Sequence, residues 1–124
     1  MDAARLGLAH EAARRVAARA ALGAARGYRF PVFAPHLNDY EPSADHYAVM
    51  ADALQQMLLQ PLDDARATLL LLPAWPCAWD VDFRLHAPNR TVVVGELRGG
   101  RWARPLEVTP ASRRQDVRVM ACQQ

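Results

Sequence analysis

The chain has 124 residues, of which 52% are hydrophobic and 23% charged, and its formal net charge is +2. Disorder of the whole chain is excluded, because disordered chains combine low hydrophobicity with high net charge. The length allows one domain, or a helical piece plus a small sheet, with a modest core. No apolar run approaches the roughly 18–20 residues of a membrane span, so no membrane partner is expected. The first five residues do not resemble a signal peptide, and none is expected in this chain.

Residues 2–25 are predicted to form one long helix. Alanine and arginine, both strong helix formers, dominate this stretch, and no proline precedes position 31. Gly23 and Gly27 are expected to end the helix, because glycine tolerates the positive φ found at helix C-termini. The predicted contact stripe consists of Leu6, His10, Ala13, Ala17 and Ala20.

A second helix is predicted from about Ala44 to Gln60, after a loop over residues 28–43 that is rich in aromatic residues and prolines. Its apolar side chains recur at spacings of three and four residues, which is typical of an amphipathic helix. Ser43 can cap this helix and Pro61 should stop it. The stripe consists of Tyr47, Met50, Ala51, Leu54, Met57 and Leu58.

From residue 67 onward the apolar period changes from 3.6 to 2, which predicts strands. Residues 68–72 form a buried-type strand, and the alternation over residues 80–86 places Val81, Phe83 and Leu85 on one face. Further strands are predicted over 91–97, 102–108 and 116–121, with turns at 88–89 and 99–100. The predicted fold class is therefore α+β, with two N-terminal helices followed by a small antiparallel β-sheet or sandwich.

All 15 basic residues are arginines, and six of them fall within residues 1–29 against two acids. Arg14, Arg15 and Arg19 could make this helix a nucleic-acid binder. The alternative is a solvated helix face, which the lack of interleaved aromatic residues before Tyr28 favours. No nucleic-acid partner is therefore expected.

Cys77 and Cys122 are isolated in the sequence, with no CxxC spacing and no histidine at ligand spacing. They predict neither a zinc site nor a disulfide framework. A buried free thiol is expected for each, and no metal or other cofactor is expected.

Asp45 and His46 are the candidate catalytic residues. They adjoin each other at a predicted helix N-terminus, where the helix dipole favours an ionised carboxylate that could act as a base. His46 could contact a substrate or orient Asp45, and Glu41 could supply a second carboxylate. The alternative is that Asp45 only caps the first turn and that His46 is a structural group.

Other acids and aromatic residues have plainer interpretations. Asp63, Asp64, Asp80 and Asp82 are typical of turns and solvent-facing strand positions. The pair Trp75 and Trp79 could stack on sugar rings, or could seal the junction between helices and sheet.

Several segments resemble (α/α)6-barrel glycoside hydrolases, especially the α-L-fucosidase family ninety-five and its uncharacterised relatives. The run Met57-Leu58-Leu59-Gln60 is similar to the end of the last barrel helix of that family. The stretch from Leu69 to Trp79, which contains Leu-Leu-Pro-Ala-Trp-Pro, is similar to the strand that enters its C-terminal β-domain. The pieces at 82–87, 98–100 and 108–110 follow in the family's order, and residues 4–25 match an earlier barrel helix.

The resemblance implies that residues 1–64 are the last helices of an incomplete six-hairpin barrel and that residues 65–124 are a C-terminal antiparallel β-domain. Asp45 then takes the place of the aspartate on the base side of the family's reaction, and His46 becomes a possible substrate contact. Family members commonly show an Asp-Gly-Asn-Phe-Gly-like run where this chain has Asp-His-Tyr-Ala-Val at 45–49, so fucose specificity is not implied. The family's general-acid glutamate has no counterpart here.

The implied function is that of a C-terminal fragment of an inverting glycoside hydrolase, inactive alone. Its expected partners are the missing barrel helices or a partner chain, and the carbohydrate substrate of the intact relative. Such relatives are often exported, which leaves the compartment open. The alternative is a carbohydrate-binding or protein-interaction module that uses Trp75, Trp79 or Trp102 on the β-strands.

Overall fold

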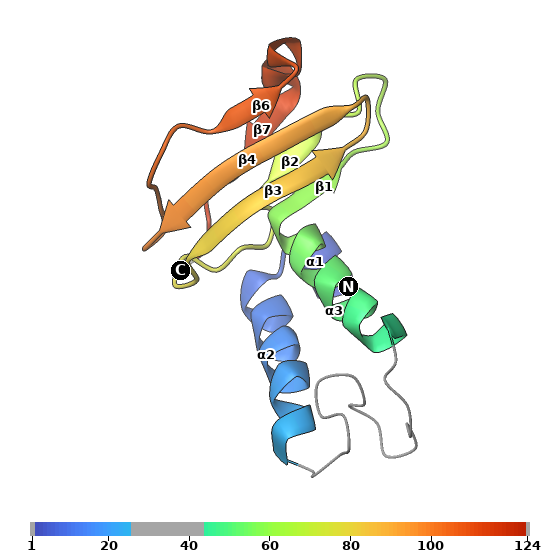
Figure 1. Cartoon of the computed structure of the whole chain (residues 1–124), viewed down its shortest axis with the longest axis vertical. Helices are drawn as coiled ribbons and strands as arrows, with labels where there is room; N and C mark the ends of the chain where they lie inside the picture. Colours follow the sequence, from blue (N-terminus) through green and yellow to red (C-terminus); the bar gives the residue numbers. More distant parts are fainter. Residues whose placement is uncertain (1, 26–43, 124) are drawn as a thin grey trace.

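Helices lead into two small sheets in this protein, as the computed structural model shows for residues 2–25 and 44–123 (Figure 1). The helices are α1 (Asp2–Arg5), α2 (Ala9–Ala25), α3 (Ala44–Leu58) and the 3-10 helix η1 (Ala111–Asp116). One sheet contains β1 (Leu59–Pro61), β2 (Leu69–Leu71) and β7 (Val117–Val119). The other contains β3 (Val81–Ala87), β4 (Thr91–Arg98), β5 (Arg101–Trp102) and β6 (Glu107–Thr109). The predicted α+β class is confirmed.

The predicted single helix over residues 2–25 is wrong, because the chain bends between α1 and α2. Gly7 has a φ of +71°, a conformation that glycine adopts without the steric cost of a side chain. A Cβ at Gly7 would also lie 3.3 Å from the carbonyl oxygen of Pro73. The N–H groups of Leu6, Gly7 and Leu8 donate to carbonyls of α1, which closes the turn.

The buried face of α2 differs from the predicted stripe. Ala9, Ala12 and Ala13 are buried and Val16 packs against the core, whereas the predicted stripe is largely exposed. Only Ala13 of that stripe is buried. Its other members are exposed; they are Leu6, His10, Ala17 and Ala20. Gly23 lies inside α2, which continues to Ala25, so its predicted role as a helix end is wrong. Gly27 lies outside the described residues.

The second helix ends at Leu58, two residues earlier than predicted. The carbonyl of Leu58 accepts the N–H of Leu72 at 2.7 Å, and that of Met57 accepts the N–H of Ala74 at 3.2 Å. These bonds satisfy carbonyl groups that a helix C-terminus leaves without intrahelical partners. The next three residues form β1, and Pro61 ends that strand at the edge of its sheet, where proline is tolerated.

The apolar side chains of α3 face two different parts of the molecule. Met50, Ala53 and Met57 face α1 and α2, whereas Leu54 and Leu58 line a groove against β3. The side chain of Tyr47 and the capping residue Ser43 lie outside what the structure describes.

β2 is the central strand of the first sheet. It pairs antiparallel with β1 and parallel with β7, through Leu69↔Val117 and Leu71↔Val119. The prediction of a wholly antiparallel arrangement is therefore wrong for the last strand, which η1 carries back to the first sheet. The predicted division between residues 64 and 65 falls in the β1–β2 loop, and it stays a prediction.

The second sheet is organised around β4. This strand pairs with β3 over seven residue pairs, and β5 and β6 both join it on its other side. The predicted strand over 102–108 is thus divided into two short strands. Phe83 is buried and Val81 and Leu85 pack against the core, which confirms the predicted inward face of β3.

The prediction of two free thiols is also wrong, because Cys77 and Cys122 form a disulfide with their Cα atoms 5.1 Å apart. The parallel return of β7 beside β2 carries Cys122 to the turn that follows β2. The two cysteines are 45 residues apart, and closing a loop of that length contributes roughly 3–5 kcal/mol in the chain-entropy model.

Gly95 generates a prediction about the packing of β4. A Cβ at this position would lie 2.5 Å from Cζ of Phe83 and 2.9 Å from Cζ3 of Trp102. Gly95→Val should therefore lower the free energy of unfolding by about 1–3 kcal/mol through overpacking, measured by urea denaturation. Val94→Thr, which changes the opposite face of the strand, is the control. Equal stability of the two variants would contradict this packing.

Candidate functional site

Asp45 and His46 lie in the first turn of α3, as the sequence predicts, and their side chains lie outside the described residues. Glu41 is outside them as well. At 1.5 Å per residue, Asp45 is about 20 Å from the end of α3 that meets the sheets. The structure therefore does not bring Asp45 together with the tryptophans of the junction, and the catalytic roles stay predictions.

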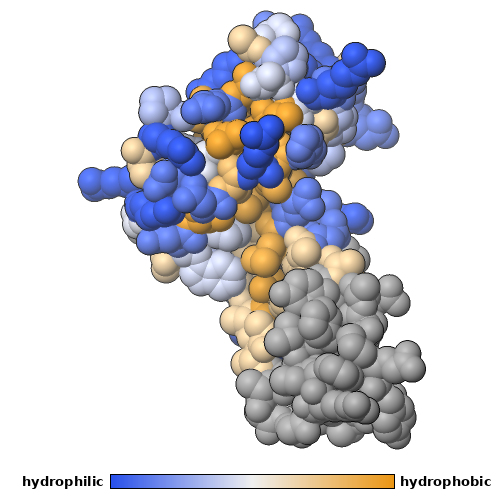
Figure 2. Space-filling view, viewed as in Figure 1, coloured by the Kyte–Doolittle hydropathy of each residue, from blue (hydrophilic) through white to orange (hydrophobic). Residues whose placement is uncertain are grey.

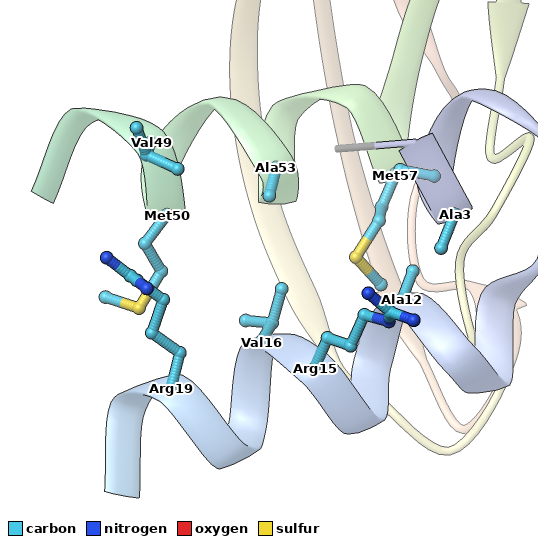
Figure 3. A pocket seen from close by; sticks show the side chains of 10 residues that line it. Ala3, Ala12, Arg15, Val16, Arg19, Val49, Met50, Ala53 and Met57 are labelled. Atoms are coloured by element: carbon cyan, nitrogen blue, oxygen red, sulfur yellow. The ribbon is translucent and has the colours of Figure 1, made fainter. Parts of the chain in front are cut away.

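The helices α1, α2 and α3 line a partly open apolar cavity of about 90 Å³ (Figure 3). Its walls are mostly small or flexible side chains, and Arg15 and Arg19 reach toward it from α2. The lining residues are Ala3, Ala4, Ala12, Arg15, Val16, Arg19, Val49, Met50, Ala53 and Met57. None of these ten carries a carboxylate, thiol, hydroxyl or imidazole, so the described part of the cavity wall can hold an apolar group and includes no general base.

The basic residues of α2 do not form one open cationic face. Glu11 forms ion pairs with Arg14 at 2.8 Å and with Arg15 at 2.6 Å. Hydrogen bonds from Arg14 and then Arg15 lower the pKa of Glu11 to about 2, so it stays ionised. Arg19 is half-buried beside Met50 (Figure 3). Glu11 thus offsets part of the charge that a phosphate backbone would need.

Trp75 lies at the junction between the helices and the sheets. It is 4% exposed, and its Nε1 donates to the carbonyl of Trp79 at 2.9 Å. The two rings meet edge to face, with centroids 5.6 Å apart. This burial fits the interpretation of Trp75 as a seal and leaves no open ring face for a sugar to stack on.

Trp102 is the exposed tryptophan of the described residues, with 36% of its surface accessible. It packs edge to face on Phe83 at 6.4 Å and borders an open groove of about 460 Å³. Arg104 and Arg114 also line this groove, so it combines an aromatic ring with guanidinium donors. Arg104 is held by Asp82 at 3.1 Å and by Glu96 at 3.3 Å.

A second open groove separates α3 from β3, lined by Leu54 and Leu58 on the helix and by residues 82–85 on the strand. Figure 2 shows hydrophobic surface continuing from the sheets toward the helices on this side of the molecule.

The other predicted acids occupy turns and solvent-facing positions, as expected. Asp64 accepts the N–H groups of Arg66 and Thr68, and hydrogen bonds from Thr68 and then Arg66 lower its pKa. Asp80 accepts the N–H of Gly99 and so supports the β4–β5 hairpin. In the described part of the chain, no group of three or more potential ligands could hold a metal, and no helix could cross a membrane.

A buried ionic cluster surrounds Arg113, and none of the sequence patterns described above predicts it. This guanidinium pairs with Asp116 at 2.6 Å and donates to Thr91 Oγ1 at 3.0 Å. It also donates to the carbonyls of Arg66 and Ala67. The cluster joins η1, β4 and the β1–β2 loop, so it stabilises the fold. The spacing of three between Arg113 and Asp116 was its one sequence signal.

The different burial of Trp75 and Trp102 predicts different effects of mutation, because Trp75 packs at the junction whereas Trp102 is open to a ligand. Trp75→Ala should lower the free energy of unfolding by about 3–5 kcal/mol, because it empties a buried site. Trp102→Ala should lower the free energy of unfolding by clearly less, because this ring is partly exposed to solvent. Urea denaturation of both variants measures the difference, and equal losses would contradict the assignment.

No family model, no curated protein and no solved structure matches this chain. The likeness to glycoside hydrolases therefore rests on the sequence runs quoted above.

Proposed function

We propose that this chain is the C-terminal part of a glycoside hydrolase similar to the α-L-fucosidase family ninety-five. The observation that carries the proposal is the direct passage from α3 into β1. The run from Met57 to Gln60, which resembles the end of the last barrel helix, spans this passage. The run from Leu69 to Trp79 packs against it, since the N–H groups of Leu72 and Ala74 donate to the last carbonyls of α3.

The helical surfaces also fit a chain that packs against further helices. On α2 the exposed positions include Ala17, Ala18 and Ala20, small side chains that allow another helix to approach closely. Val49 on α3 is 43% exposed beside the interhelical cavity. These surfaces would meet the missing barrel helices or a partner chain.

In an inverting hydrolase of this kind, one carboxylic acid protonates the leaving oxygen while the opposite carboxylate activates water, with the two groups about 6.5–9.5 Å apart. Asp45 would act on the base side, where the dipole of α3 favours its ionised form. His46 would contact the sugar. The general acid would come from a part of the barrel that this chain does not carry.

Because the general acid is missing, the purified chain should not hydrolyse nitrophenyl glycosides, the α-L-fucoside included, above the rate of a blank. Absorbance of released nitrophenol is the measurement. Turnover by the chain alone that disappears in Asp45→Asn would contradict the proposal.

Complementation tests the proposal positively. A family ninety-five enzyme that lacks its last helices and β-domain is mixed with this chain, and restored hydrolysis with inversion is expected. Asp45→Asn should lower the restored rate roughly 10²–10⁴-fold, as expected for a group in general-base catalysis. Asp63→Asn, in the exposed β1–β2 loop, is the matched control. An active complex that Asp45→Asn leaves unchanged would contradict the role of Asp45.

The second candidate function is a carbohydrate-binding module, favoured by the exposed ring of Trp102 beside its groove. Affinity electrophoresis in polysaccharide gels distinguishes it. A binding module would be retarded, and Trp102→Ala would abolish the retardation while leaving the chain folded. The hydrolase-fragment proposal requires no such retardation.

A further inference from the structure

Residues 120–123, here called the C-terminal strap, connect the first sheet to the bend between α1 and α2. The N–H of Met120 donates to the carbonyl of Leu71, which continues the pairing of β7 with β2. Further along, the N–H of Gln123 donates to the carbonyl of Trp75, and the backbone carbonyl of Gln123 accepts the N–H of Cys77. The Cys77–Cys122 disulfide lies between these bonds and fixes the strap covalently to the turn after β2.

The side chain of Gln123 reaches the bend between α1 and α2. Its Nε2 donates to the carbonyl of Gly7 at 2.6 Å, and its Oε1 accepts the N–H of Ala9 at 3.2 Å. Ala9 is the first residue of α2 and is fully buried. The first N–H groups of a helix have no intrahelical acceptor, and an unpaired buried donor is costly. Gln123 therefore caps α2 from the other end of the chain.

We propose that the Cys77–Cys122 disulfide is a redox-controlled clamp that keeps Gln123 on the bend between α1 and α2. While the disulfide is intact, the strap is short and anchored, so the amide of Gln123 is held beside Gly7 and Ala9. When it is reduced, only hydrogen bonds hold the strap, so Gln123 leaves the bend more often and the cap on Ala9 is weakened. The state of one disulfide thus sets how firmly the first two helices attach to the sheets.

The reduction step is ordinary thiol–disulfide exchange with a dithiol. One thiolate of the dithiol attacks a sulfur of the Cys77–Cys122 bond, forms a mixed disulfide and displaces the other cysteine as a thiolate, which takes a proton. The second thiol of the reagent then attacks the mixed disulfide and releases the remaining cysteine. Two electrons and two protons pass to the protein, and the dithiol becomes a disulfide. Both cysteines are only half-buried.

Amide NMR of the whole chain with and without dithiothreitol tests the clamp. On reduction, the Ala9 resonance should move toward its position in the Gln123→Ala variant, while the Val93 resonance in the centre of β4 stays in place. Exchange of the Ala9 amide in oxidised Gln123→Ala should be roughly tenfold faster than in the native protein, the change expected when one buried hydrogen bond is lost. Gln115→Ala, an exposed amide on η1, is the matched control and should change neither resonance.

Three results would overturn the proposal. The first is an Ala9 resonance that does not move on reduction. The second is an oxidised Gln123→Ala variant whose Ala9 amide exchanges at the native rate. The third is loss of all dispersed resonances on reduction, because the disulfide would then hold the whole fold rather than the bend.

Discussion

The arrangement of helices and sheets depends on how α3 ends. A helix leaves its last carbonyl groups without intrahelical partners. Here two of these carbonyls accept hydrogen bonds from the N–H groups of Leu72 and Ala74, in the chain that follows β2. The helix can therefore stop at Leu58 and continue at once as β1. Because β1 then pairs with β2, two sets of hydrogen bonds connect the end of α3 to the central strand: those to its last carbonyls and those of the β1–β2 ladder.

The core follows from that junction. Met57 and Leu59, on either side of the passage, are buried with Leu69 and Leu71 of β2, and Trp75 closes the same cluster. The second sheet contributes Phe83, Val93 and Leu97 to this cluster, as do the alanines of α1 and α2. Apolar burial is the dominant favourable term in folding, so one continuous cluster makes the helices and both sheets depend on each other.

Local patterns in the sequence predicted much of this, and long-range contacts account for the errors. The alternation of β3 and the stripe of α3 depend on near neighbours, and both led to correct elements. The bend at Gly7 involves Pro73, and Cys122 meets Cys77 only after β7 has joined β2, so neither could be inferred from spacing alone. For the candidate site, helical periodicity correctly placed Asp45 in the first turn of a helix. Under the proposed function, the catalytic role of Asp45 depends on a general acid outside this chain, which no local pattern can show.

Because they share this core, the helices and sheets should unfold as one cooperative unit through the α3–β1 junction. Urea unfolding of the oxidised protein, followed by tryptophan fluorescence and by far-UV circular dichroism, tests it most directly. Trp75 and Trp79 report on the junction and Trp102 on the second sheet, whereas the dichroism is dominated by the helices. We expect superimposable transitions with a single midpoint. A helical transition at clearly lower urea than the fluorescence transition would contradict it.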